Sequence, residues 1–534
     1  MQTAERIITA GRIVTMSGPG DAEALAIANG RIASVGRTAD VDRLSGPGTI
    51  RDHFPDATVT PGLIDAHLHT VKFGLGLGQV DLDPRIAPDM KALVRQVGRR
   101  AQLTTSGEWI LGRGYDQNQL AAGRHPTRWD LDEVSPSHPV MLTHNSGHMS
   151  VANSLALQLA GIGPDTPAPA GGAISRDASG LPDGLLQETA QSLVRSVVPP
   201  PDRAQVREAI RLAHLRFAQE GLTAVHEAGC PSAHPAEIGI YQESLEQGEL
   251  LARTHLMIYP RELPEGCTLG LGLRTQRGTA GLLTIGPLKL MADGSLIGLT
   301  AVMHDPFEGL ARDTGIWVTA PEQLRQLAAT GHRAGWQLAT HAIGDKAVET
   351  VLDIYEALQR RWPRAEARHR IEHCGVLNER LVARLAATGT IPVTQPRFIC
   401  QLGEGFRRAL GEQRLRLTYP LRTLLEAGIR VAAGSDRPVV DGAPLLGIHA
   451  GVNQMTAAGR AYVPAEAVTF RQALAMYTVN AARAAHQEAF TGSLAPGMAA
   501  DLTILGGDPE RDPSEIGSLP VLATMVGGRW THLA

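Results

Sequence analysis

The chain has 534 residues, with 50 Lys and Arg against 54 Asp and Glu, so its net charge of −4 gives no electrostatic case for binding nucleic acid or an anionic membrane. Its four cysteines form no C-x-x-C pair, which argues against a disulfide framework and a zinc ribbon. Residues 1–16 lack the apolar core of a signal peptide, and no run approaches the length of a membrane span, so we expect a cytoplasmic protein.

Short strand-like runs punctuated by glycine occupy the N-terminal end, at 6–9, 12–16, 24–28 and 31–35. The C-terminal end has the same character, at 501–505 and 521–526. Neither end has enough strands to be stable alone. We therefore predict that residues 1–57 and 490–534 pair into one composite β-sandwich.

Between these ends, residues 58–489 alternate strand-like with helix-like runs, the pattern of parallel βα units. Apolar residues at helical spacing after Asp202, around 348–355 and around 420–425 mark three of the helices. The expected strands are 59–65, 222–226, 254–259, 285–291, 336–341, 369–373, 391–395 and 429–433. Eight such units predict a (β/α)₈ TIM barrel, whose chemistry lies at the carboxyl ends of its strands.

One connection in this barrel is far longer than the others. Residues 71–201 separate the first two expected strands, whereas most βα connections are short. The segment leaves from the carboxyl end of the first strand, which is the catalytic face of such a barrel. We predict that residues 71–201 form an inserted subdomain that acts as a lid over the barrel mouth.

The first barrel strand ends in His67-Leu68-His69. Side chains two residues apart on a strand point to the same face, so both imidazoles can aim at one point. Two neutral imidazoles that converge in this way make half of a divalent metal site. The alternative is a pair of polar loop histidines, but candidate ligands recur at later strand ends and favour the metal.

Those later candidates are Lys289, His341, His373 and Asp436. Leucines flank Lys289, so we expect it to be buried, and burial favours a neutral amine that can react with carbon dioxide to form a carbamate. A carbamate can bridge two metals; an ion pair with Asp293 is the alternative. Asp436 follows three small residues at the eighth strand end, where a ligand and proton acceptor is favoured over a helix N-cap.

Other residues are candidates for contacts with a substrate or for support of the site. His148 and Asp116 lie in the insertion, where we expect substrate contacts, against the alternatives of a structural histidine and a turn aspartate. His226 is interpreted as a histidine that supports the metal ligands from behind. Cys374 is interpreted as a small buried side chain. Gln395 and Arg437 are further candidates for substrate contacts, at the ends of the seventh and eighth strands.

Taken together, these segments resemble the amidohydrolase superfamily, and within it the YtcJ-like group, amidohydrolase family 3. The resemblance rests on AIANGRIASVG, TPGLIDAHLH, SGHMSVANSLAL, KLMADGS, THAIGDKAV, RIEHCG, AAGSDRPV and GSLAPGMAADLTIL, in this order. It implies a TIM barrel with a split β-sandwich and a site for two divalent metal ions. By that pattern one metal is held by His67, His69 and Asp436, the other by His341 and His373, and a carbamylated Lys289 bridges them. Nitrogen and oxygen donors without thiolate suit zinc and also admit manganese, iron or cobalt.

The predicted function is hydrolysis of a non-peptide C–N bond by a hydroxide that bridges the two metals. The substrate class is an amide or N-acyl compound, with N-formyl compounds as a special case. The alternatives are a single-metal deaminase-like enzyme, an ester or lactone hydrolase and, at a lower rank, a non-catalytic barrel homologue. The expected partner is a small-molecule substrate, with neither nucleic acid nor membrane, and a homo-oligomer stays an open alternative.

Overall fold

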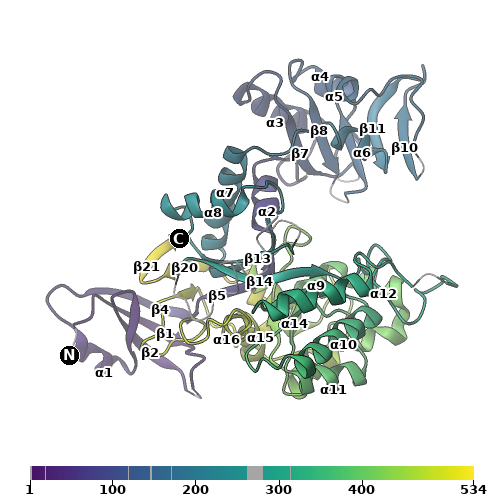
Figure 1. Ribbon diagram of the computed structural model, residues 1–534. Helices are drawn as coiled ribbons and strands as arrows, with labels where there is room; N and C mark the ends of the chain where they lie inside the picture. The colour runs from purple at the N-terminus through teal and green to yellow at the C-terminus, as the bar shows by residue number, and fades with distance from the viewer. Residues whose placement is uncertain are drawn as a thin grey trace. The chain divides into compact units, whose positions relative to one another are not determined.

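The computed structural model describes residues 3–18, 20–117, 120–144, 147–169, 171–260, 281–312 and 314–534. The chain forms two compact units, Met1–Val71 with Ala213–Ala534, and Lys72–Leu212. Each unit has its own sheets and core (Figure 1).

The first unit contains the predicted barrel. Its eight parallel strands are β5 (Leu63–Leu68), β12 (Leu222–Cys230), β13 (Arg253–Ile258), β14 (Leu283–Met291), β15 (Leu338–Ala342), β16 (Arg370–His373), β17 (Ile391–Thr394) and β18 (Ala432–Ala433). They pair in the order β18-β17-β16-β15-β14-β13-β12-β5, so neighbours in the sheet follow one another in the chain. Every residue of β12, β13, β16 and β17 is buried, as expected of strands covered on both faces. The TIM barrel is confirmed.

Helices cover the outside of this barrel (Figure 1). They include α7 (Arg203–Gln219), α8 (Glu237–Glu246), α9 (Pro321–Arg333), α10 (Asp345–Arg361), α11 (Glu379–Thr388), α12 (Pro396–Arg414), α13 (Leu421–Glu426), α14 (Pro444–Asn453), α15 (Phe470–Met476) and α16 (Val479–Ala484). The helices expected after Asp202, around 348–355 and around 420–425 correspond to α7, α10 and α13.

The first barrel strand begins later than the sequence predicts. Residues 59–61 belong to β4 (Ile50–Pro61) of a different sheet, and β5 starts only at Leu63. Gly62 makes the break: a Cβ added there would lie 2.1 Å from the Thr223 Oγ1, so no other residue fits without a shift. The run 59–65 thus serves two sheets: β4 pairs with strands of the terminal sheet, and β5 pairs with β12 of the barrel.

Both ends of the chain contribute to one seven-stranded sheet. Its strands are β1 (Arg6–Ile13), β2 (Ala22–Ala28), β3 (Arg31–Gly36), β4, β19 (Leu502–Leu505), β20 (Val521–Val526) and β21 (Arg529–Leu533), in the order β21-β20-β19-β4-β1-β2-β3. The N-terminal strand β4 pairs antiparallel with the C-terminal strand β19. Ile8, Val59, Leu502 and Met525 pack in its core. The strands expected at 6–9 and 12–16 are replaced by the single strand β1, which ends at Ile13.

The second unit lies in the chain between β5 and β12. Its six strands, β6 (Val80–Asp81), β7 (Ile110–Tyr115), β8 (Val140–His144), β9 (Met149–Ala152), β10 (Gly172–Arg176) and β11 (Pro182–Glu188), pair in the order β10-β11-β9-β8-β7-β6. The helices are α3 (Met90–Leu103), α4 (Arg128–Asp132), α5 (Ser154–Leu159) and α6 (Gln191–Arg195). Leu93, Val97, Ile110 and Leu142 form part of a separate core. Its action as a lid stays a prediction.

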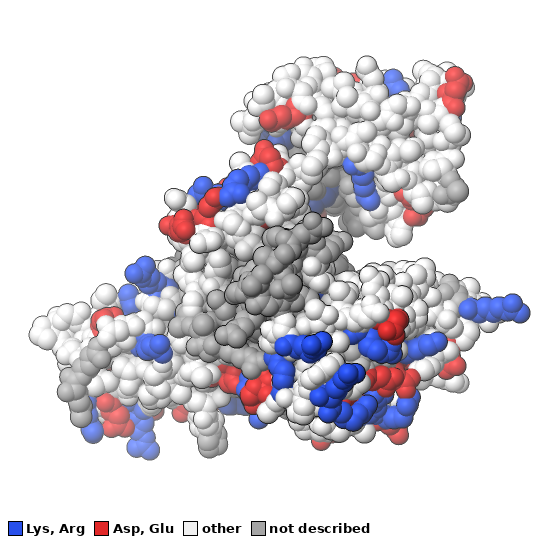
Figure 2. Space-filling model, in the orientation of Figure 1, with Lys and Arg blue, Asp and Glu red and all other residues white. Residues whose placement is uncertain are grey.

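Charged side chains of both signs are interspersed over α10 and α11 on the face shown in Figure 2. Arg384 of α11 pairs with Asp353 and Glu356 of α10 across the helix interface. Such surface pairs contribute only about 0–1 kcal/mol each to stability. Because the two signs alternate, these two helices present no patch of a single charge on this face. Within the described residues, no helix is both long and apolar enough to cross a bilayer.

Candidate metal centre

Three predicted ligands meet at the carboxyl ends of the first and last barrel strands. His67 lies in β5, His69 follows before α2 (Thr70–Leu77), and Asp436 lies in the loop after β18. The Asp436 Oδ1 is 3.4 Å from the His67 Nε2 and 3.2 Å from the His69 Nε2. One donor atom from each of the three lies within 4.8 Å of the others, close enough for one metal ion.

Hydrogen bonds across the seam between β5 and the loop after β18 hold these ligands in place. The Asp65 Oδ1 accepts from the amides of His67 and Ser435, both at 3.0 Å. The Asp436 amide donates to the His67 carbonyl at 2.7 Å, and the His69 amide donates to the Arg437 carbonyl at 2.9 Å. Gly434 permits this approach, because a Cβ there would lie 2.5 Å from the His67 amide nitrogen. The bonds that join the edges of the barrel therefore also set the spacing of the candidate ligands.

A buried ion pair orients the His67 ring. The His67 Nδ1 contacts the Glu372 Oε2, and Glu372 also accepts from Arg370 at 2.8 and 2.9 Å. Arg370 and Glu372 are fully buried. Burial opposes the charge of Glu372, but Arg370 and then His67 hold its carboxyl pKa well below its usual range. Because a carboxylate only accepts, the proton of His67 sits on Nδ1, and Nε2 is the ring atom that can bind a metal.

His341 and His373 lie beside this group. The His373 ring centroid is 4.8 Å from that of His67 and 4.5 Å from that of His341. The His373 Nδ1 donates to the Gln395 Oε1 at 2.8 Å, and the His341 Nε2 donates to the Gly294 carbonyl at 2.9 Å. The opposite ring atoms, His373 Nε2 and His341 Nδ1, are therefore the ones available as ligands.

Both histidines are neutral at physiological pH, as metal ligands must be. Burial, then the charge of Lys289, lowers the pKa of His341 to about 4. Burial and the neighbouring His341 hold the pKa of His373 well below its ordinary value. Lys289 itself is 2% exposed.

Asp436 is ionised. Burial opposes its charge, but hydrogen bonds from His67 and His69 hold the carboxyl pKa well below its usual range. Asp436 and His373 also have left-handed backbone conformations, with φ of 57° and 70°. Such a conformation costs about 1–3 kcal/mol per residue and occurs mostly where surrounding structure holds it, as at functional sites.

Asp293 and Cys374 of the barrel have contacts typical of structural residues. The Asp293 carboxylate accepts from the amides of Val302, Ile343 and Gly344 at 2.8–3.0 Å. Burial raises the pKa of the Cys374 thiol, so it is a poor nucleophile.

The His226 Nδ1 lies 3.2 Å from an Arg370 guanidinium nitrogen. The Arg437 guanidinium pairs with Glu220 at 2.7 Å and lies over the Phe217 ring. These contacts give both residues a place in the packing around the site.

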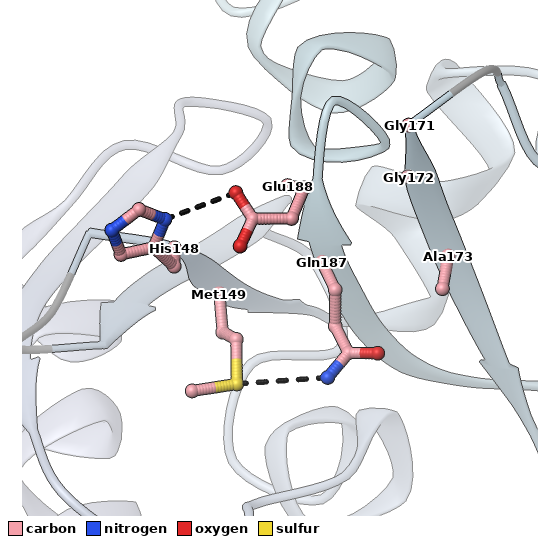
Figure 3. A pocket seen from close by; sticks show the side chains of 7 residues that line it. All are labelled: His148, Met149, Gly171, Gly172, Ala173, Gln187 and Glu188. Atoms are coloured by element: carbon pink, nitrogen blue, oxygen red, sulfur yellow. Dashed lines mark hydrogen bonds and ion pairs between the residues drawn. The ribbon is translucent and has the colours of Figure 1, made fainter. Parts of the chain in front are cut away.

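His148 and Asp116 lie in the other compact unit. His148 is largely exposed, and its Nδ1 is 3.0 Å from the Glu188 Oε2 (Figure 3). The pair lines a pocket of about 400 Å³ together with Met149, Gln187 and residues Gly171, Gly172 and Ala173. Asp116 is buried, with its Oδ1 3.7 Å from the His144 Nε2. Their contacts with a substrate stay predictions.

Sequence reasoning missed Asp65, Glu372 and Arg370 as residues that position the candidate ligands, and it expected Gln395 to contact substrate rather than to hold His373. One signal was present in the sequence: Arg370 and Glu372 stand two apart on a buried strand that ends in His373, so they share a face. Charged residues on a fully buried strand need partners, and here the partners are each other and His67.

Four matches to known proteins bear on the family. The model of the amidohydrolase family matches residues 56–532. A Bacillus subtilis (strain 168) chain named as an amidohydrolase, YtcJ, is 30% identical, covering 97% of this chain and 98% of its own length. N-substituted formamide deformylase of Arthrobacter pascens is 32% identical over 95% and 94% of the two chains. The crystal structure of an uncharacterized metal-dependent hydrolase from Pyrococcus furiosus superposes with a TM-score of 0.76 at 26% identity, over 95% of this chain and 99% of that one.

Proposed function

The chain belongs to the amidohydrolase family of metal-dependent hydrolases, and on that premise we propose that it cleaves a non-peptide C–N bond in an amide or N-acyl compound. The observation that carries the proposal is the convergence of His67, His69 and Asp436 at the carboxyl ends of the first and last barrel strands. N-formyl compounds are the first candidates, since one relative similar over nearly its whole length is an N-substituted formamide deformylase.

The donors fit a divalent metal. His67 offers Nε2, His69 and Asp436 lie beside it, and His341 and His373 offer a further pair of ring nitrogens. We assign the first three residues to one ion and the last two to a second, with zinc as the first choice for both. A divalent ion in such a site lowers the pKa of the water that it binds and polarises a substrate carbonyl.

Lys289 is proposed to join the two sets of ligands as a carbamate. Its uncharged Nζ adds to the carbon of carbon dioxide; one N–C bond forms, one proton leaves, and the side chain changes from an amine to an anion with two oxygen donors. The burial of Lys289, and the effect of its charge on His341 and His373, support a position next to the histidines. An anion there would also offset the positive charge of two metal ions.

Asp436 is proposed as the group that moves the proton. As an ionised carboxylate within 3.4 Å of two ligand nitrogens, it can accept the proton of the attacking water. It then delivers that proton to the departing amine nitrogen, so a poor leaving group departs as a neutral amine. His67 and His69, held by the seam described above, keep the carboxylate aimed at the site.

A substrate panel tests this function. The purified protein, loaded with zinc, manganese or cobalt, is incubated with N-substituted formamides, other N-acyl amines, cyclic amides and esters, and amine and acid release are measured. We expect amide substrates to be cleaved, and activity to be lost with a chelator and restored by metal. Cleavage of esters alone would refute the bond class, and chelator-resistant activity would refute the metal dependence.

A further inference from the structure

We propose that Glu227 is a positioning residue that fixes which nitrogen of His69 faces the metal. This inference rests on the proposed ligation by His69. Glu227 lies in β12, the strand that pairs with β5, and is fully buried. Its Oε1 lies 3.8 Å from the His69 Nδ1, on the opposite side of the ring from Asp436.

The carboxylate of Glu227 is anchored through its other oxygen. Oε2 accepts the Thr70 amide at 2.6 Å and the Tyr241 hydroxyl at 3.0 Å. Thr70 immediately follows His69, so the same carboxylate binds the first residue of α2 and lies beside the His69 ring. Oε1 accepts no hydrogen bond from the described residues and points at the imidazole. An approach of about 0.8 Å would turn this contact into a hydrogen bond.

The chemical consequence concerns the tautomer of His69. Burial, then the charge of Glu237, raises the pKa of the Glu227 carboxyl to about 8, and a dication bound at His69 would favour its ionised form. An ionised carboxylate only accepts, so Glu227 favours the proton of His69 on Nδ1 and leaves the Nε2 lone pair directed toward Asp436. Each histidine of the H-x-H pair then has its own buried carboxylate: Glu372 behind His67 and Glu227 behind His69. The two carboxylates come from different strands, β16 and β12, so they orient the rings independently.

Glu227→Gln tests the assignment sharply. Thr70 and Tyr241 both donate to Oε2, so the glutamine oxygen takes that place and its NH₂ group faces the His69 Nδ1. That donor favours the proton on Nε2, which removes the lone pair that binds metal. Glu237→Gln is the matched control: Glu237 is also buried, but its carboxylate accepts from the amides of Ser232 and Ala233. Its charge raises the pKa of Glu227, so its removal favours the ionised Glu227 and should not weaken metal binding.

The measurement is zinc affinity and stoichiometry of the metal-free proteins, by competition with a chelator, together with their melting temperatures. Glu227→Gln should weaken binding about 10–100-fold while Glu237→Gln stays near wild type, with similar melting temperatures. Wild-type affinity in Glu227→Gln, or an equal loss in both variants, would overturn the inference. His69→Asn tests its premise separately: if that variant keeps wild-type affinity, the ligation by His69 itself is wrong.

Discussion

Glu372→Gln should both destabilise the barrel and weaken metal binding. Arg370 and Glu372 are fully buried and joined by two hydrogen bonds, and Glu372 also holds the His67 Nδ1. Removing the charge of one partner leaves the buried guanidinium uncompensated, which costs about 3–5 kcal/mol. A neutral amide oxygen at the Oε2 position holds the His67 Nδ1 less strongly than the carboxylate does, and weakening such a partner lowers metal affinity by up to about 10–100-fold.

Asp501→Asn provides the control that separates these effects. Asp501 forms a comparable buried pair with Arg253, at 2.7 and 3.0 Å, in contact with the terminal sheet rather than with a candidate ligand. Urea unfolding of the metal-free proteins should show a similar loss of free energy of unfolding in both variants. Chelator competition should show weakened zinc binding in Glu372→Gln alone. Unchanged zinc affinity in Glu372→Gln would refute the role of Glu372 in orienting His67.

Variants of four further residues test the metal centre, the insertion and the pH dependence of stability. Asp436→Asn removes most of the basicity at constant volume, so turnover should fall by about two to four decades while bound metal persists; activity near wild type would contradict its role. Lys289→Arg places a permanent cation beside the metals, where a like charge at about 4 Å costs about 4 kcal/mol per unit charge at an effective permittivity of about 20, so at least one metal should be lost. Lys289→Ala should regain some activity with formate or acetate plus metal, and equal rescue of both Lys289 variants would count against the carbamate. His148→Ala should impair turnover at unchanged metal content and melting temperature, whereas an equal loss of stability would indicate a structural role. Burial lowers the pKa of His214 from 6.5 to about 3, so the unfolded chain binds the proton more readily than the folded one. The free energy of unfolding therefore falls as pH drops below 6.5, by about 2 kcal/mol at pH 5. Urea unfolding at pH 7 and pH 5 should show that His214→Gln abolishes this part of the acid sensitivity.

The barrel could be predicted because its strands are apolar runs bounded by glycine, proline and polar residues, a signal that is local in the sequence. Where tertiary contacts decide, the sequence misled. The run 59–65 looks like one strand but serves two sheets, because its two parts pair with different partners far along the chain, β19 and β12. The pairing of β1 with β2 shifts in register between Thr9 and Ile13, and the residue pattern suggests two strands where the structure has one.

The candidate ligands could be predicted from residue type and position, since each histidine or aspartate closes a strand of a recognisable parallel barrel. The groups that orient them could not. Glu372, Gln395 and Glu227 acquire their meaning only when strands distant in sequence bring them to the unused ring nitrogens of His67, His373 and His69. The sequence around a buried glutamate or glutamine does not indicate which histidine its side chain will face in the folded barrel.

The most direct test of the metal centre is a crystal of the zinc-loaded protein measured at wavelengths on either side of the zinc absorption edge. The assignment predicts an anomalous difference peak bounded by the His67 Nε2, His69 Nε2 and Asp436, with a second peak beside His341 and His373. Zinc bound elsewhere in an active enzyme, with no peak at His67, His69 and Asp436, would contradict it.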